Sequence, residues 1–103
     1  MKYKSIRGDY VDEVVERVVN TFEINLPIIR IQHGKYLIGT ELKMLVIKAD
    51  YCMVRVGGGF ERLEEYVARN QDAEIDKIRK LMVEHQKSYP QVMVDLLYKY
   101  SAE

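Results

Sequence analysis

The spacing of apolar residues changes twice along the chain, and this change most constrains the fold. Residues 9–22 carry apolar side chains at helical spacing, residues 29–56 alternate as strands do, and residues after 60 return to helical spacing. A period near 3.6 indicates an amphipathic helix, and a period of two indicates a half-buried strand. Because the strands are grouped together, the pattern predicts an α+β fold with a small antiparallel sheet.

The expected elements are one N-terminal helix, about four strands and three C-terminal helices. The first helix has Asp9 as its expected N-cap. The strands are expected over residues 29–32, 35–38, 42–48 and 51–56, with turns at His33-Gly34 and Ala49-Asp50. Residues 42–48 form a near-continuous apolar run, which predicts a central strand buried on both faces. A helix is expected from Phe60, a break at Asn70–Asp72, a second helix after it, and a third capped by Ser88.

The composition predicts one folded domain over residues 1–103. The hydrophobic share is 48% and the charged share is 31%, which argues against disorder. Sixteen basic residues balance sixteen acidic ones, so no strong global field attracts nucleic acid. No apolar run approaches the roughly 20 residues that cross a bilayer, and the first residues lack the apolar stretch of a secretory signal. We therefore expect a cytoplasmic protein with neither nucleic acid nor membrane among its partners.

No residue pattern predicts catalysis, a metal or a cofactor. The single cysteine, Cys52, excludes an internal disulfide, and its place in a predicted strand favours a buried, inert thiol. His33 lies in a turn and His85 on the apolar side of a helix, and neither has neighbours that would complete a set of metal ligands. We expect no enzyme activity.

Three consecutive glycines, Gly57-Gly58-Gly59, follow the last predicted strand. They could form a nest of amides that binds an anion at the start of the helix from Phe60. They could instead form a turn that needs positive φ or close approach of the backbone. The lysine and hydroxyl of a phosphate-binding loop do not follow, so we favour the structural turn.

Positive charge is concentrated in the predicted sheet, and both flanking helical segments are net acidic. The sheet cations are Arg30, Lys35, Lys43, Lys48 and Arg55. They could form a basic face that docks on an acidic polymer, or a solvated face whose lysines protect strand edges. Strand alternation puts Lys43 opposite Lys48, so not all five can act together. Arg55 has a competing role, pairing with Glu64 or Glu65 to fix the glycine turn.

Two motifs in the middle of the chain resemble those of a known family. They are Gly34-Lys35-Tyr36-Leu37-Ile38-Gly39 and Met53-Val54-Arg55-Val56-Gly57-Gly58-Gly59-Phe60. The segment is similar to the GAR domain, the growth-arrest-specific-related module of spectraplakins and their smaller relatives. The resemblance covers about residues 22–71 and leaves residues 72–103 as a helical extension. The motif residues are Gly34, Tyr36, Gly39, Gly57, Gly58, Gly59 and Phe60, the last standing where the family usually has tryptophan.

The resemblance implies a cytoskeletal module that binds microtubules, often beside actin-binding domains. It makes tubulin the expected partner of the basic sheet face, with other cytoskeletal proteins as further partners, in the cytoplasm, at the cytoskeleton or in the cilium. Family members commonly carry cysteines on both sides of this segment, and some could hold zinc; those cysteines are absent here, so no metal site is expected. The alternative is a scaffold or adaptor module in a cytoskeletal or ciliary assembly, without tubulin affinity of its own.

Overall fold

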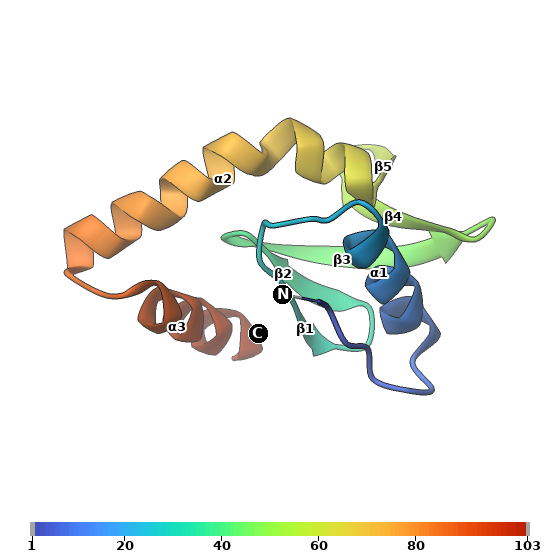
Figure 1. The fold of residues 1–103 in the computed structure, drawn as a ribbon, viewed down its shortest axis with the longest axis horizontal. Helices are drawn as coiled ribbons and strands as arrows, with labels where there is room; N and C mark the ends of the chain where they lie inside the picture. The colour runs from blue at the N-terminus through green and yellow to red at the C-terminus, as the bar shows by residue number, and fades with distance from the viewer. Residues whose placement is uncertain (1, 103) are drawn as a thin grey trace.

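The computed structural model describes residues 2–102. Helix α1 (Tyr10–Thr21) precedes a five-stranded antiparallel sheet, and helices α2 (Leu63–His85) and α3 (Tyr89–Ser101) follow it (Figure 1). The strands are β1 (Ile28–Gln32), β2 (Lys35–Ile38), β3 (Glu41–Lys48), β4 (Tyr51–Val56) and β5 (Gly59–Arg62). They lie in the sheet in chain order, each paired antiparallel with the next. The predicted α+β class is confirmed.

Both predicted hairpin turns are confirmed. His33 and Gly34 join β1 to β2, and Gly34 has a φ of 73°. Ala49 and Asp50 join β3 to β4 with φ of 49° and 67°, the left-handed values that a type I′ turn requires. Strand β3 is central, as expected, but the prediction that it is buried on both faces was wrong. Only its residue Leu45 is buried, because one side of the sheet is open there.

The glycine segment forms a third hairpin, so the sheet has five strands where about four were expected. Val56 pairs with Gly59 across the turn residues Gly57 and Gly58, and Gly57 has a φ of 38°. The chain then continues as β5, and the helix expected from Phe60 begins three residues later. The glycines are thus a structural turn between two strands, and they do not lie at a helix start.

Helix α2 continues through the expected break, so two C-terminal helices replace the three that were predicted. It is 23 residues long. The Asn70 side chain donates to the backbone carbonyl of Tyr66, one turn earlier, at 2.9 Å. Because its amide is satisfied inside the helix, Asn70 does not end it. The true end is at Gln86, which adopts the left-handed conformation, and Ser88 then caps α3 as predicted.

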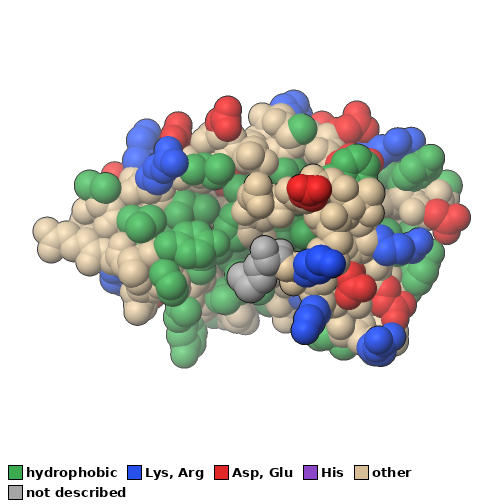
Figure 2. All heavy atoms as spheres, viewed as in Figure 1, with side chains coloured by type: hydrophobic (Ala, Val, Ile, Leu, Met, Phe, Trp, Pro, Cys, Tyr) green, Lys and Arg blue, Asp and Glu red, His purple; other side chains and the backbone are tan. Residues whose placement is uncertain are grey.

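Apolar side chains pack on both sides of the sheet. On the inner side, α1 and the first turns of α2 cover the main core. Its fully buried members are Val15, Tyr36, Ile38, Leu45, Cys52, Val54 and Leu63. On the outer side, α3 covers β1 and β2, where Leu37 packs with Ile78 and Met93. In Figure 2, hydrophobic side chains gather between α2 and α3, whereas charges of both signs are mixed over the α1 region.

Glu74 connects α2 to the turn between β2 and β3. Its Oε1 accepts hydrogen bonds from the amide and the hydroxyl of Thr40, both at 2.7 Å, and Lys77 Nζ lies 2.9 Å from its Oε2. Burial raises the pKa of Glu74, but hydrogen bonds from Thr40 and Lys77 together bring it below its ordinary value. Gly39 has a φ of 62°, and a Cβ there would lie 2.6 Å from this Oε1.

Replacing Gly39 by alanine is expected to lower the free energy of unfolding by about 2–4 kcal/mol, from the positive φ and the displaced Glu74 carboxylate. Gly8 is a matched control, because its φ is 91° and nothing lies within 4 Å of its Cβ position. Gly8→Ala should therefore cost only the backbone term, about 1–2 kcal/mol. Urea unfolding followed by circular dichroism measures both. Equal losses in the two variants would show that the contact with Glu74 is unimportant.

Candidate functional site

The outer surface of β3, β4 and β5 forms an exposed sheet face. Cross-strand pairing places on it Met44, Val46, Lys48, Tyr51, Met53, Arg55, Phe60 and Arg62, and we call these residues the open sheet face. Met44, Tyr51 and Phe60 are 48%, 47% and 37% exposed. These three apolar side chains are therefore exposed on the same face of the sheet.

Three cations of the open sheet face lie over two aromatic rings. Lys48 Nζ is 3.7 Å from the centroid of the Phe60 ring, and Arg55 Cζ is 5.7 Å from the same centroid. Arg62 Cζ is 3.8 Å from the centroid of the Tyr51 ring. The register accounts for part of this arrangement, because Arg55 is directly opposite Phe60, and Arg62 is opposite Met53, two residues from Tyr51 and so diagonal to it. Lys48 is directly opposite Tyr51 and reaches from β3 past β4 to the Phe60 ring of β5. Such cation–π contacts orient a cation and leave its charge in place.

The positive charge of this face is not neutralised by carboxylates. Among residues 2–102, none of Lys48, Arg55 and Arg62 lies within ion-pair distance of an acidic side chain. Asp50, in the adjacent turn, accepts a hydrogen bond from Tyr10 of α1, which lies on the other side of the sheet. The alternative role for Arg55, a pair with Glu64 or Glu65, is therefore not adopted.

The five cations predicted for the basic site lie on both faces of the sheet. Lys48 and Arg55 are on the open sheet face. Lys43 is opposite Tyr36 on the inner side, and its Nζ lies 5.3 Å from the Tyr66 ring. The expected separation of Lys43 from Lys48 is thus observed.

The other two expected cations are held by the fold. Arg30 donates from Nε to Asp9 at 2.7 Å, and its side chain is 24% exposed. Lys35 is on the outer side, opposite Met44, but only 8% exposed. A cation that was not predicted, Arg62, lies on the open sheet face together with Lys48 and Arg55. Arg62 was not predicted as a site residue, because the helix was expected to begin at Phe60. The alternation of Phe60, Glu61 and Arg62 after a Gly-Gly turn could have indicated a strand there.

Asp12 is the centre of a buried polar cluster on the inner side. Its carboxylate accepts hydrogen bonds from the hydroxyls of Tyr3 and Tyr36, at 2.5 and 2.8 Å, and from the amide of Ile6 at 2.7 Å. Burial and the adjacent Asp12 raise the pKa of both tyrosines, so they remain protonated donors. Tyr36, a residue of the GAR-like motif, therefore has a structural role.

Asp9 extends this cluster to the β1–β2 hairpin. Besides Arg30, it pairs with His33 Nδ1 at 3.0 Å and caps α1 through the amide of Asp12. Burial raises the pKa of Asp9, but the hydrogen bonds from Arg30, Asp12 and His33 together bring it below its ordinary value. The Arg30 guanidinium thus stabilises the fold.

Acidification is expected to destabilise the fold below about pH 5. Asp9 and Glu74 have lowered pKa values when folded, so the unfolded chain takes up their protons first. Their stabilisation is present above the unfolded pKa and is lost as the pH falls through the folded value. Urea unfolding between pH 7 and about pH 3 measures this, and Glu74→Gln should flatten the profile. Stability that is constant or rises toward low pH would contradict the assignment.

Cys52, the single cysteine, is buried in the core. Burial, followed by the charge of Glu64, raises the pKa of Cys52 to about 12, which keeps the thiol protonated. Within residues 2–102, no three His, Cys, Asp or Glu side chains are grouped so that they could hold a metal ion. In the same part of the chain, neither α2 nor another helix is long and apolar enough to span a bilayer.

The fold is thus a small α+β module with an exposed sheet face that carries cations and aromatic rings. The profile of the Growth-Arrest-Specific Protein 2 Domain family matches residues 9–75, well over half of the chain. The chain belongs to this family, the GAR domain family of cytoskeletal binding modules, and the resemblance seen in the sequence is confirmed. The match includes α1, all five strands and the first half of α2.

Comparison with curated proteins gives the same family. The human (Homo sapiens) protein "GAS2-like protein 1" is 29% identical over 86 residues, covering 80% of this chain and 12% of the relative. The mouse (Mus musculus) "GAS2-like protein 1" is 31% identical over 64 residues, covering 58% of this chain and 9% of the relative. The chain thus matches about an eighth or less of the length of these relatives. No solved structure matches it.

Proposed function

We propose that this chain binds microtubules through its open sheet face. The observation that carries the proposal is the set of three un-neutralised cations, Lys48, Arg55 and Arg62, fixed over aromatic rings on an exposed face. An acidic filament surface is complementary to such a face, and membership of a cytoskeletal family makes tubulin the expected filament protein. In this proposal Lys48, Arg55 and Arg62 make the contact, and Arg30, Lys35 and Lys43, which lie off the open sheet face or are buried, do not.

The attraction between the open sheet face and an acidic filament is local, because the chain as a whole has no net charge. The three cations are gathered on one face, so they act together at distances within a Debye length, about 10 Å at 0.1 M salt. Exposed charges at that range are screened by added salt. The proposed interaction is therefore strong at low ionic strength and weakens steeply as salt is added.

Co-sedimentation with stabilised microtubules tests the proposal. The chain should pellet with microtubules at about 25 mM salt, and the bound fraction should fall several-fold at about 150 mM. Bovine serum albumin and a tube without microtubules are the controls. If the chain remains in the supernatant at the lower salt concentration, it lacks tubulin affinity of its own.

A scaffold or adaptor role is the second candidate function. It is favoured by the apolar side chains that the last two helices expose, since Val83 and Tyr98 are each 77% exposed. Exposed apolar groups of this size on a helical pair are typical of protein–protein contact. The two functions are compatible, because these helices lie outside the open sheet face.

A further inference from the structure

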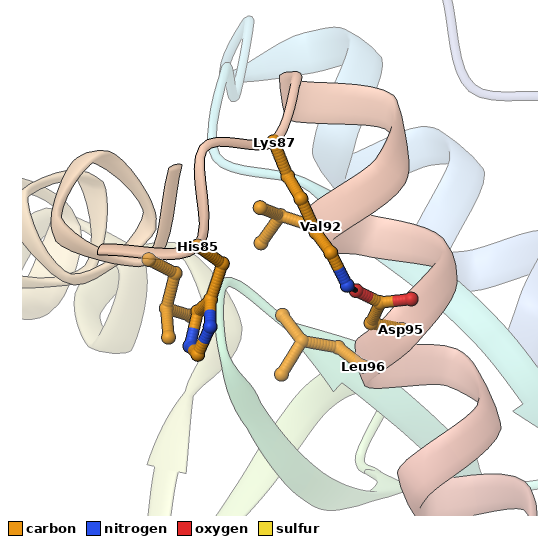
Figure 3. Close-up of a pocket in the computed structure, with 6 residues that line it drawn as sticks. His85, Lys87, Val92, Asp95 and Leu96 are labelled. Carbon is orange, nitrogen blue, oxygen red and sulfur yellow. Dashed lines mark hydrogen bonds and ion pairs between the residues drawn. The ribbon is translucent and has the colours of Figure 1, made fainter. Parts of the chain in front are cut away.

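A second positively charged surface lies between α2 and α3, and we call it the α2–α3 groove. Two adjoining hollows of about 130 and 390 Å³ share the side chains of Leu81 and Leu96. Val92 completes the apolar floor. In Figure 3, Val92 and Leu96 of α3 point into the smaller hollow, with His85 of α2 across from Leu96. The groove therefore has apolar walls contributed by both helices.

Cations dominate the rim of this groove. The lining cations are Lys77, Lys80, Lys87 and Lys99, and the lining carboxylates are Glu41 and Asp95. Lys87 Nζ lies 2.6 Å from Asp95, and Lys77 bridges Glu74 and Glu41 at 2.9 and 3.9 Å.

Lys80 and Lys99 are the rim cations that no carboxylate neutralises. Neither forms an ion pair with any residue of the described chain, and both side chains are exposed. Lys99 lies beside the ring of Tyr100, with Nζ 5.2 Å from its centroid. The groove thus keeps two unneutralised positive charges, one on each helix.

The two walls of the groove are attached to the same residue, Thr40, in the turn between β2 and β3. Thr40 donates from its amide and hydroxyl to Glu74 of α2, and its carbonyl accepts a hydrogen bond from the Tyr100 hydroxyl of α3 at 3.0 Å. Because one turn residue fixes both helices, their separation does not depend on a partner. A preformed groove lowers the entropic penalty of binding.

We propose that the α2–α3 groove docks an acidic amphipathic segment of another protein. An apolar floor flanked by unneutralised lysines is complementary to a helix with leucine-like side chains on one face and glutamates beside them. The helix would lie along the groove, with its apolar face on Leu81 and Leu96, above the buried Val92, and its carboxylates near Lys80 and Lys99. This inference stands apart from the proposed microtubule contact, because the two surfaces share no residue.

Fluorescence anisotropy with a labelled synthetic peptide tests the inference. The probe is a 16-residue helix former with leucines at positions i, i+3, i+4 and i+7 and glutamates on both flanks of that stripe. The folded full chain should bind it saturably. Replacing the glutamates by lysine, or the leucines by serine, should each abolish binding, since the groove needs both the charge and the apolar stripe.

Protein variants locate the site. The double variant K80E/K99E should lower peptide affinity by about tenfold or more, whereas the control K4E/R17E, which carries the same charge change on exposed residues away from the groove, should not. Circular dichroism checks that both are folded. Equal losses in the two variants, or full binding by the serine peptide, would overturn the proposal. Sedimentation equilibrium of the chain alone must show a monomer; a dimer abolished by K80E/K99E would assign the groove to a second copy.

Discussion

Reversing Lys48, Arg55 and Arg62 together to glutamate is expected to lower the affinity for microtubules by about a hundredfold or more. Each reversal replaces an attraction to the acidic filament by a repulsion, worth about 1 kcal/mol or more for partly screened charges, and about 1.4 kcal/mol corresponds to a tenfold change. Because the three side chains lie on one face and form no ion pair with any acidic side chain of residues 2–102, their losses should accumulate. Co-sedimentation at about 25 mM salt over a range of microtubule concentrations measures the dissociation constant.

A matched variant separates this site from overall charge. K4E/R7E/R17E makes the same change in net charge at exposed positions on the N-terminal segment and α1. It should reduce binding much less than the open-face variant. Equal reductions would mean that only net charge matters, and normal pelleting of the open-face variant would remove that face from the interaction. The thermal unfolding of both variants shows whether the fold is intact.

Replacing Asp12 by alanine is expected to have the largest effect on stability, lowering the free energy of unfolding by about 3–5 kcal/mol. Asp12 is 1% exposed, and its carboxylate is the common acceptor for Tyr3, Tyr36 and the Ile6 amide. Its removal leaves three donors without this partner, at about 1–3 kcal/mol for each donor that stays buried and unsatisfied. A domain of this size has about 5–15 kcal/mol in total, so the variant should be partly unfolded at 37 °C.

Urea unfolding followed by circular dichroism measures the loss in D12A. Tyr36→Phe removes one donor and leaves the carboxylate two others, so it should lose only about 1–2 kcal/mol. Glu65→Ala, at an exposed position of α2, should change stability by less than about 0.5 kcal/mol. If D12A were as stable as E65A, the buried cluster would not be a source of stability.

The elements with unambiguous periodicity were predictable from sequence. The valine stripe of α1, the alternation in β1, β2 and β4, and the His33-Gly34 turn each carry a local signal, and tertiary packing agrees with it. The Asp9 and Ser88 caps were also predictable from the sequence. Each side chain accepts a hydrogen bond from the amide three residues ahead, so the contact is local.

The errors occurred where local signals support two structures. Phe60 and Leu63 have helical spacing, but Phe60 and Arg62 also share one face of a strand, and pairing with β4 decides between them. Asn70 is a short polar residue that suits a helix end, yet its amide is satisfied within α2. The pairing of β5 with β4 is not encoded within a short window of sequence, whereas the Asn70 bond to Tyr66 is local but forms only if the helix continues.

The candidate site was predictable only in part. Alternation alone separated Lys43 from Lys48, and the structure places them on opposite faces. The ion pair of Arg30 with Asp9 joins residues 21 positions apart, so it depends on how α1 packs against the sheet. Arg62 could be placed on this face only once β5 was known, and the contacts of Lys48 with Phe60 and of Arg62 with Tyr51 join residues of different strands that are not directly paired.

The uninterrupted course of α2 has a mechanical consequence. Its 23 residues extend about 35 Å, most of the longest dimension of the molecule, 43 Å. The N-terminal end of α2 follows directly from β5, the edge strand that carries part of the open sheet face, and the C-terminal end forms a wall of the α2–α3 groove. With the two proposed contacts occupied, a force between the partner in the groove and the microtubule would be transmitted along one continuous helix. No break within α2 would let the two binding surfaces move relative to each other.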